Sequence, residues 1–191
     1  ALLDERGTVS YRDLAGRVRA YAGWAVRQEI MPGDTVCLLL PNCADYLAIW
    51  LGIARVGGVA ALVNTNLVGA ALAHCLGIVA PRHVIVGAAL LDNFAAARDT
   101  LAADVRCWAH GGDGLGLARI EAEIAVHGPP APDSLETAAP TLGDRALYIY
   151  TSGTTGLPKA ASVSHFRLMQ WSHWFAGMMD VRPDDRMYDC L

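Results

Sequence analysis

The chain has 191 residues, which is long enough for one good hydrophobic core and for one domain with part of a second. Apolar residues make up 53% of it and charged residues only 18%, so we expect a globular chain with a large buried fraction rather than a disordered one. The formal net charge is −4 and the two signs are interspersed, which argues against the basic stripe that nucleic acid needs and the polybasic cluster that anionic lipid attracts.

The cysteines and the ends of the chain bear on its compartment. The five cysteines are widely spaced and form no Cys-x-x-Cys pair, so we expect no zinc site, no disulfide framework and reduced thiols in the cytoplasm. Charged residues 4–6 interrupt the start, which does not resemble a signal peptide. The longest uncharged run, 56–81, is broken near its middle by Asn64-Thr65-Asn66, so we interpret it as strand, loop and helix rather than a membrane span.

The spacing of apolar residues predicts helices that alternate with buried strands. Ser10 and Asp13 fit the start of a helix over 11–28, with Ser10 as the N-cap. Asn42 is expected to cap the next helix, and Gly57-Gly58 to end it. The expected strands are 36–40, 59–63, 83–86, 105–109 and 146–150, and the expected later helices are 43–56, 69–79, 88–102 and 165–179.

This alternation predicts an α/β fold with a doubly wound, largely parallel sheet flanked by helices. We expect α/β layers over 1–127, a proline-rich connection over 128–143, and a strand, loop and helix over 144–191. Residues 111–116 form an expected loop that holds no complete G-x-G-x-x-G and follows the fourth strand, so it does not fit a dinucleotide-binding turn. Ligands of such sheets bind outside the carboxyl ends of the strands.

A hydroxyl-rich loop follows the last expected strand. Residues 151–156 read Thr-Ser-Gly-Thr-Thr-Gly, and Lys159, the only lysine of the chain, lies three residues later. Gly153 and Gly156 permit positive φ, so backbone N–H groups can turn inward around an anion. A compact ammonium can follow a moving phosphate, whereas a guanidinium prefers one geometry. The pattern predicts a polyphosphate site; the alternatives are a hairpin that binds nothing and an ordinary solvated lysine.

The loop does not match the Walker pattern G-x-x-x-x-G-K-[ST]. The position five residues after Gly153 is Pro158, and the residue after Lys159 is Ala160. Since no hydroxyl follows the lysine, the usual magnesium ligand of that pattern is missing. A P-loop NTPase is therefore disfavoured.

The stretch Tyr150-Thr-Ser-Gly-Thr-Thr-Gly-Leu-Pro-Lys159 resembles the phosphate-binding signature of adenylate-forming (AMP-binding) enzymes, which include acyl-CoA synthetases, peptide-synthetase adenylation domains and luciferases. Further segments resemble one branch, the fatty acid transport proteins or very-long-chain acyl-CoA synthetases, and the resemblance extends from Val9 over essentially the whole chain. These segments are Asn64-Thr-Asn66-Leu67, Leu72 with His74-Cys75-Leu76, Ala160-Ala161, Val163-Ser-His165 and Tyr188-Asp-Cys-Leu191.

The resemblance implies a reaction in two steps. A fatty acid carboxylate attacks the α-phosphate of Mg-ATP to give acyl-adenylate and pyrophosphate, and the thiol of coenzyme A then displaces AMP. It also implies that the loop holds the β- and γ-phosphates while Lys159 assists and helps pyrophosphate to leave. The site residues implied in this way are Thr151, Ser152, Gly153, Thr154, Thr155, Gly156 and Lys159.

Several other residues are interpreted more plainly. His165 has either a catalytic role or a structural one at a helix terminus, where local backbone would satisfy it. His74 and His83 are expected to be core or surface residues. Trp171 and Trp174 are expected to pack in a core rather than to line an acyl tunnel.

The resemblance further implies that the chain is a fragment of a longer enzyme, cut at both ends. The magnesium ligand, the ribose-binding aspartate, the hinge and the C-terminal lysine of the family would follow Leu191. We therefore expect the isolated chain to be inactive and to bind ATP weakly. We also expect truncation to leave a sheet edge and an apolar face uncovered.

Three alternative functions stay open. The first is an adenylate-forming ligase for an aryl or amino acid, and the second is a membrane transporter without chemistry. The third is a non-catalytic nucleotide-binding module. The favoured interpretation has ATP, a fatty acid and coenzyme A as partners and no nucleic acid. It places the protein in the cytoplasm, in peripheral contact with the cytoplasmic face of a membrane.

Overall fold

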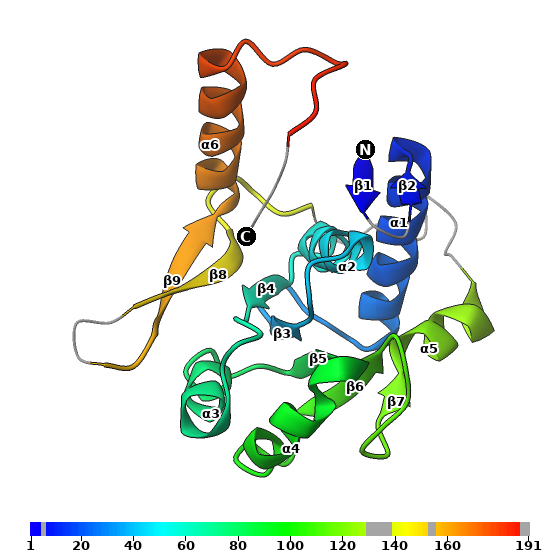
Figure 1. Cartoon of the computed structure of the whole chain (residues 1–191), viewed down its shortest axis with the longest axis vertical. Coiled ribbons are helices and arrows are strands. Elements are labelled where there is room, and N and C mark those ends of the chain that lie inside the picture. Colours follow the sequence, from blue (N-terminus) through cyan, green and yellow to red (C-terminus); the bar gives the residue numbers. More distant parts are fainter. Residues whose placement is uncertain (5–6, 129–138, 153–155, 188–191) are drawn as a thin grey trace.

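A seven-stranded sheet forms the centre of the computed structural model, which describes residues 1–4, 7–128, 139–152 and 156–187 (Figure 1). The order of its strands is β7-β6-β5-β3-β4-β8-β9. These strands are β3 (Thr35–Leu39), β4 (Val59–Leu62), β5 (His83–Gly87), β6 (Arg106–His110), β7 (Ala118–Arg119), β8 (Arg145–Thr151) and β9 (Lys159–Ser164). A separate antiparallel pair, β1 (Leu2–Asp4) and β2 (Gly7–Val9), precedes it.

Six of the seven strands run parallel, and only β9 is antiparallel to its neighbour β8. Every residue of β3 and β5 is buried, which is expected of central parallel strands with both faces covered. The predicted α/β fold with a largely parallel sheet is confirmed.

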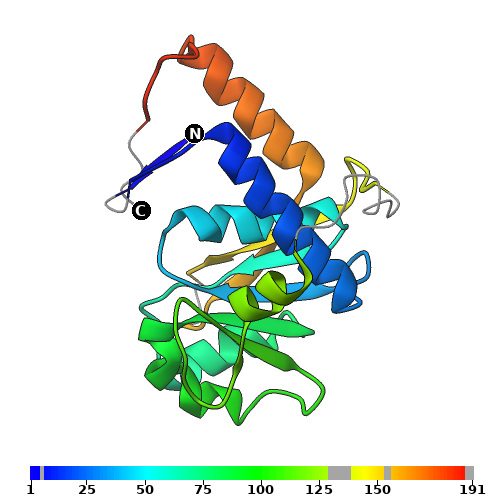
Figure 2. The same cartoon turned by 90° about the vertical axis from the view of Figure 1, so that its right-hand side faces the viewer.

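Helices cover both faces of the sheet (Figure 1, Figure 2). On one face lie α1 (Tyr11–Arg27), α2 (Ala44–Arg55) and α5 (Ile120–His127); on the other lie α3 (Gly69–Gly77), a 3-10 turn (Ala88–Leu90) and α4 (Leu91–Arg98). Successive strand residues point to opposite faces. Val36 and Leu38 therefore join the core beneath α1 and α2, and Cys37 and Leu39 join the core beneath α3 and α4.

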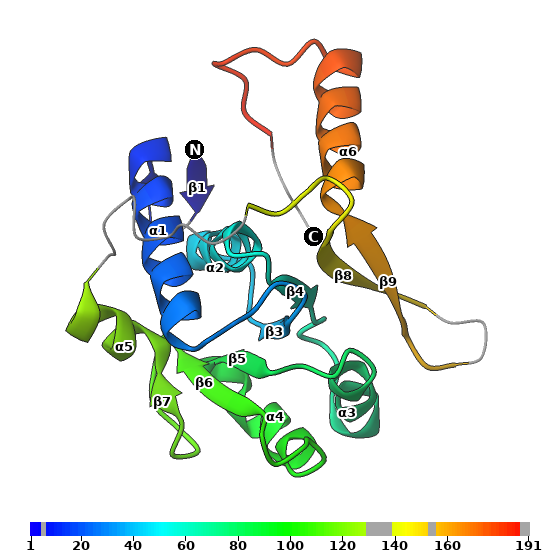
Figure 3. The same ribbon diagram turned by 180° about the vertical axis from the view of Figure 1, so that it is seen from behind.

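The hairpin of β8 and β9 leads into α6 (His165–Met178), which stands away from the rest of the sheet (Figure 1, Figure 3). The side chain of Ser164 caps this helix by accepting a hydrogen bond from the backbone N–H of Arg167. No residue of α6 is buried. The expectation that Trp171 and Trp174 pack in a core is therefore wrong, because the outward course of α6 leaves them 44% and 65% exposed.

Most expected elements are present, with shifted ends. The capping box of Ser10 and Asp13 starts α1 as predicted. The N-cap of α2 is Cys43 rather than Asn42, which lies one residue too early. The expected helix over 88–102 is broken, because a 3-10 turn precedes α4 and α4 ends at Arg98. Five short elements were not predicted: β1, β2, β7, α5 and β9.

Candidate functional site

The predicted phosphate loop joins β8 to β9. The two strands pair from Arg145 opposite Ser164 to Thr151 opposite Lys159, so Thr151 and Lys159 form the last pair of the ladder. Because β8 runs parallel to β4, the loop projects from the carboxyl end of a parallel strand. That is where ligands bind in doubly wound sheets.

The predicted site residues fall into two groups. Thr151, Ser152, Gly156 and Lys159 are described and exposed to solvent. Gly156 has a φ of +97°, which confirms the positive φ expected there. Gly153, Thr154 and Thr155 lie outside the described residues.

Lys159 is an exposed cation at the base of the loop. Within the described ranges, no carboxylate lies within ion-pair distance of its ammonium group, although six other basic side chains there make such pairs or histidine–carboxylate contacts. Ladder pairing holds its backbone opposite Thr151, so the ammonium and the first hydroxyl of the loop start from facing positions. This arrangement offers donors and positive charge to an anion.

The last turn of α3 contacts both strand ends beside the loop. The phenol of Tyr150 donates to the backbone oxygen of Cys75 at 2.6 Å, and Nε2 of His74 lies 3.0 Å from the backbone oxygen of Pro158. Burial, followed by the nearby thiols of Cys37 and Cys75, raises the pKa of Tyr150 above its usual range, so its hydroxyl stays a donor. His74 was expected to be a core or surface residue; it is half-buried and bonded to the loop segment.

Two further contacts stiffen the hairpin itself. The guanidinium of Arg145 lies over the ring of Tyr148, 4.9 Å from its centre, and donates to the hydroxyl of the same tyrosine. Arg145 also donates from Nε to the hydroxyl of Ser162 on β9, at 2.8 Å. Both strands that carry the loop are therefore joined by side chains as well as by the ladder.

His165 is the first residue of α6. Its backbone N–H donates to the backbone oxygen of Asp144 at 3.0 Å, which fits the structural role at a helix terminus. Its ring atom Nε2 is buried and has no hydrogen-bond partner among the described residues. The backbone contact therefore joins His165 to Asp144 and not to Lys159 or Thr151.

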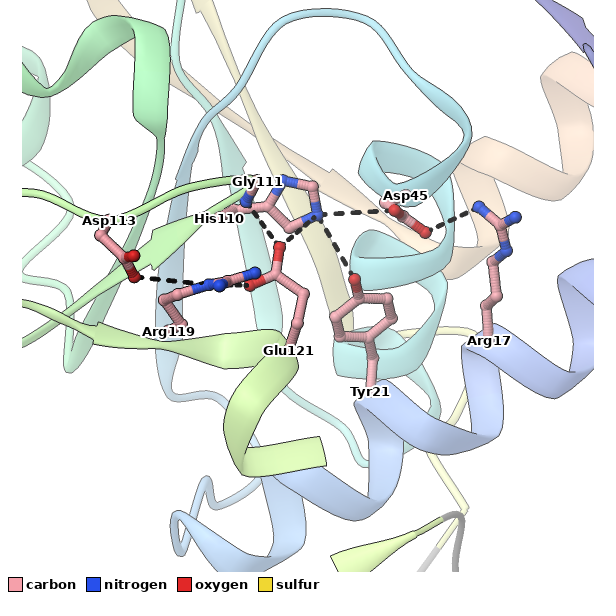
Figure 4. A network of polar contacts seen from close by, with 8 residues as sticks. All are labelled: Arg17, Tyr21, Asp45, His110, Gly111, Asp113, Arg119 and Glu121. Carbon is pink, nitrogen blue, oxygen red and sulfur yellow. Dashed lines mark hydrogen bonds and ion pairs between the residues drawn. The ribbon is translucent and has the colours of Figure 1, made fainter. Parts of the chain in front are cut away.

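Sequence reasoning missed a second polar cluster, which surrounds His110 at the carboxyl end of β6 (Figure 4). The ring Nε2 lies 3.4 Å from the hydroxyl of Tyr21 and 3.6 Å from carboxylates of both Asp45 and Glu121. Contact with His110 and the neighbouring Arg17 lowers the pKa of the Asp45 carboxyl. The cluster joins α1, α2 and α5 to β6, and its members lie too far apart in sequence for spacing to reveal it.

The described residues hold no group of three or more His, Cys, Asp or Glu side chains placed to bind a metal ion. Nor do they include a helix with the length and apolar character needed to cross a bilayer.

Comparison with known protein families gives one match over the full length of the chain. The pattern of the family described as "AMP-binding enzyme" covers residues 1–191.

Individual relatives and solved structures narrow the comparison. Over 177 residues, the chain is 37% identical to "Long-chain fatty acid transport protein 1" of Rattus norvegicus, and the matched region covers 90% of this chain and 27% of the rat protein. It is 30% identical over 187 residues to "Medium/long-chain-fatty-acid--CoA ligase FadD6" of Mycobacterium tuberculosis, covering 96% of this chain and 30% of that protein. The crystal structure of ATP-bound MatB from Rhodopseudomonas palustris matches 97% of this chain and 35% of its own, with a TM-score of 0.79 and 26% identity. The chain thus spans less than a third of the length of these curated relatives.

Proposed function

The chain belongs to the AMP-binding enzyme family, and on that premise we propose that the full-length protein is an AMP-forming ligase of long- or very-long-chain fatty acids and coenzyme A. One observation carries the choice of substrate: 37% identity over 177 residues with a protein named for long-chain fatty acid transport. The mycobacterial relative, at 30% identity, is named as a medium/long-chain-fatty-acid–CoA ligase and supports the same choice.

The proposed reaction has two balanced steps. A carboxylate oxygen of the fatty acid attacks the α-phosphorus of ATP, and the bond from that phosphorus to the bridging oxygen breaks, so pyrophosphate leaves. The thiol of coenzyme A, after losing its proton, then attacks the acyl carbon, and AMP leaves with the bonding electrons. The products are acyl-CoA, AMP and pyrophosphate.

We assign the phosphate tail of ATP to the loop between β8 and β9. Exposed hydroxyls of Thr151 and Ser152, backbone N–H groups near Gly156 and the ammonium of Lys159 supply donors and one positive charge. Such groups act by stabilising the charge that grows on the leaving pyrophosphate, without covalent chemistry. Gly153, Thr154 and Thr155 belong to the same proposed loop.

Magnesium accompanies ATP in this proposal and neutralises phosphate charge when bound. The described residues hold no cluster of acidic and histidine side chains that fits a metal ion. We therefore assign no step to the metal and no ligand to this chain. No residue of the chain is assigned to coenzyme A.

We propose a cytoplasmic location, with peripheral contact to a membrane in the full-length protein. The support is the name of the rat relative, which concerns transport of long-chain fatty acid. Conversion to the CoA ester would trap the acid after entry, and uptake would then follow from the chemistry. Cell fractionation tests this: the protein should pellet with membranes at low salt and be released by alkaline carbonate.

The decisive experiment is ATP–pyrophosphate exchange by the full-length protein with a panel of acids. We expect exchange with fatty acids of long chain, little with benzoate or amino acids, and formation of acyl-CoA and AMP when coenzyme A is added. Exchange that depends on an aryl or amino acid instead would replace the substrate class. ATP binding without exchange for any acid would leave a non-catalytic nucleotide-binding module.

A further inference from the structure

The last turn of α3 is bonded to both sides of the phosphate loop. The hydroxyl of Tyr150 on β8 donates to Cys75, and the carbonyl of Pro158, just before β9, contacts His74 at 3.0 Å. A carbonyl oxygen only accepts, so Nε2 of His74 must carry the hydrogen. Two neighbouring residues of one helix thus hold the strand that leads into the loop and the segment that leads out of it.

The acceptor on α3 explains the hydroxyl of Tyr150. Because α3 ends at Gly77, the carbonyl of Cys75 lies in the last turn, where no helical N–H four residues further on is available. The aromatic ring of Tyr150 packs against the core beneath α3 and α4, which a phenylalanine would do equally well. The hydroxyl is therefore explained by its bond to Cys75 on α3, beside the Cys37 thiol, rather than by the packing.

The donor on α3 explains the half-buried His74. Pro158 has no backbone N–H, so its carbonyl is the polar backbone group by which this residue can be held. The next residue is Lys159, the first residue of β9, whose partner across the ladder is Thr151. A bond at Pro158 therefore fixes the backbone immediately before the ammonium-bearing residue, and the bond at Tyr150 fixes the backbone immediately before Thr151.

We propose that His74 and Tyr150 are positioning residues of the phosphate site, which hold Thr151 and Lys159 at the separation that the phosphates of ATP require. This inference rests on the proposed function, because it presumes that the loop receives ATP. Neither residue touches the nucleotide in this assignment; each acts through the backbone of its neighbour. Loss of either bond widens the range of positions open to the loop, so ATP binds less often in the productive arrangement.

The kinetic test uses ATP–pyrophosphate exchange by the full-length protein. His74→Leu removes the donor and puts an apolar side chain of similar size in its place, and Tyr150→Phe removes only the hydroxyl. We expect each change to raise KM for ATP about fivefold to tenfold, the effect of one lost hydrogen bond. KM for the fatty acid should stay within about twofold of the wild-type value, because the acid is bound elsewhere in this proposal.

His74→Gln is the matched control. Its side-chain amide can donate to the Pro158 carbonyl, so we expect it to restore KM for ATP to within about twofold of the wild-type value. A merely structural role predicts another result: partial unfolding reduces the amount of active enzyme and lowers kcat, with both KM values unchanged. Unchanged KM for ATP in His74→Leu, an equal rise for both substrates, or no rescue by glutamine would overturn the proposal.

A second readout needs no catalysis. Hydrogen exchange of the backbone amides of 151–160, measured by mass spectrometry on the same full-length proteins, should be faster by at least about fivefold in His74→Leu than in the wild type or His74→Gln. Exchange in α2, on the other face of the sheet, should not change. Equal rates in 151–160 for all three proteins would refute the positioning role.

The two readouts separate the failure of this inference from failure of the proposed function. A wild-type protein that shows no ATP–pyrophosphate exchange with any acid would reject the function. Hydrogen exchange would then still decide whether α3 holds the loop. If the wild type shows normal ATP–pyrophosphate exchange and His74→Leu changes neither this reaction nor hydrogen exchange, the inference alone is rejected.

Discussion

Lys159 stands opposite Thr151 at the end of a ladder, and in the described ranges it has no carboxylate partner. We predict that Lys159→Ala in the full-length protein slows ATP–pyrophosphate exchange by roughly 100-fold, because one preorganised donor to the leaving pyrophosphate is lost. Lys159→Arg should recover only part of the rate, since a guanidinium fork does not follow a moving phosphate as an ammonium does.

The thioester-forming step distinguishes this role from general damage. When acyl-adenylate and coenzyme A are supplied directly, Lys159→Ala should form acyl-CoA at close to the wild-type rate, because pyrophosphate has already left. Arg167→Ala is the control, since Arg167 is an exposed cation on α6, beyond the other end of β9, and lies 5.6 Å from the centre of the Trp171 ring. Wild-type pyrophosphate exchange in Lys159→Ala would refute the assignment.

His83 is a buried base whose neutral form the fold requires. Its side chain is 1% exposed, and its Nδ1 accepts a hydrogen bond from the indole of Trp108 at 3.1 Å. Burial, with Arg106 and Arg82 nearby, lowers the pKa of His83 to about 4. The unfolded chain, with an ordinary histidine pKa of about 6.5, binds a proton at a pH where the folded chain does not.

The pH dependence of unfolding tests this. The contribution of neutral His83 to the free energy of unfolding is fully present above about pH 6.5 and is lost as the pH falls towards about 4. The free energy of unfolding measured in urea should therefore fall by about 2 kcal/mol between roughly pH 7 and pH 5. His83→Gln keeps an acceptor for Trp108 and should reduce the loss of stability between these two pH values. An unaltered slope in His83→Gln would contradict the depressed pKa.

At the scale of elements, the close crossing of α1 and α2 depends on one small residue. A Cβ atom added at Gly52 of α2 would lie 2.8 Å from Cβ of Tyr21 and 3.0 Å from backbone atoms of Ala22 and Val18. Backbone atoms in a packed helix cannot yield as a flexible side chain does. We predict that Gly52→Ala destabilises the chain by about 1–2 kcal/mol, because the steric overlap of the new Cβ atom outweighs the gain in helix propensity.

Gly16→Ala is the matched control within α1. Nothing lies within 4 Å of a Cβ atom at this position. The substitution should therefore stabilise the chain by about 0.5–1 kcal/mol through helix propensity alone. Urea unfolding of both variants measures the difference, and a stabilised Gly52→Ala would mean that the two helices can separate without loss.

The elements that sequence patterns predicted are those with strong periodicity or full burial. Central strands such as β3 are continuous apolar runs, and α1 carries both a capping box and a buried stripe. The edge strand β9 was missed because its sequence, Lys-Ala-Ala-Ser-Val-Ser, has only one buried residue, Val163. Helix α5 was missed for a similar reason, since its eight residues bury only Ile120.

The candidate site was predictable in part. The hydroxyls, glycines and lysine of 151–159 are local in sequence, so spacing and the resemblance could identify them together. The bonds from α3 to Tyr150 and Pro158 join residues 75 and 84 positions apart, and the contact of Tyr21 with His110 spans 89 positions. Only the parallel crossovers of the sheet bring such pairs together, so no local pattern could reveal them.

At the scale of the whole molecule, both faces of the central strands are covered, but α6 is not. Phe166, Met169, Trp174 and Met178 on this helix are each between 47% and 65% exposed, and no residue of α6 is buried. Contiguous apolar surface of this kind drives association in water. We predict that the 191-residue chain, produced alone, self-associates at micromolar concentration, which sedimentation velocity at several concentrations would measure.

The association should depend on the apolar side chains of α6 and not on exposed apolar residues in general. Replacing Trp174 and Met178 together by glutamine should weaken self-association at least about tenfold, since burial of two large apolar side chains stabilises a contact by several kcal/mol before the cost of ordering. Val126→Gln is the control, because Val126 is 78% exposed but belongs to α5, which lies apart from α6 (Figure 1). If the α6 variant associated as strongly as the control, the contact would have to lie elsewhere, and the exposed edge of β9 would be the next surface to test.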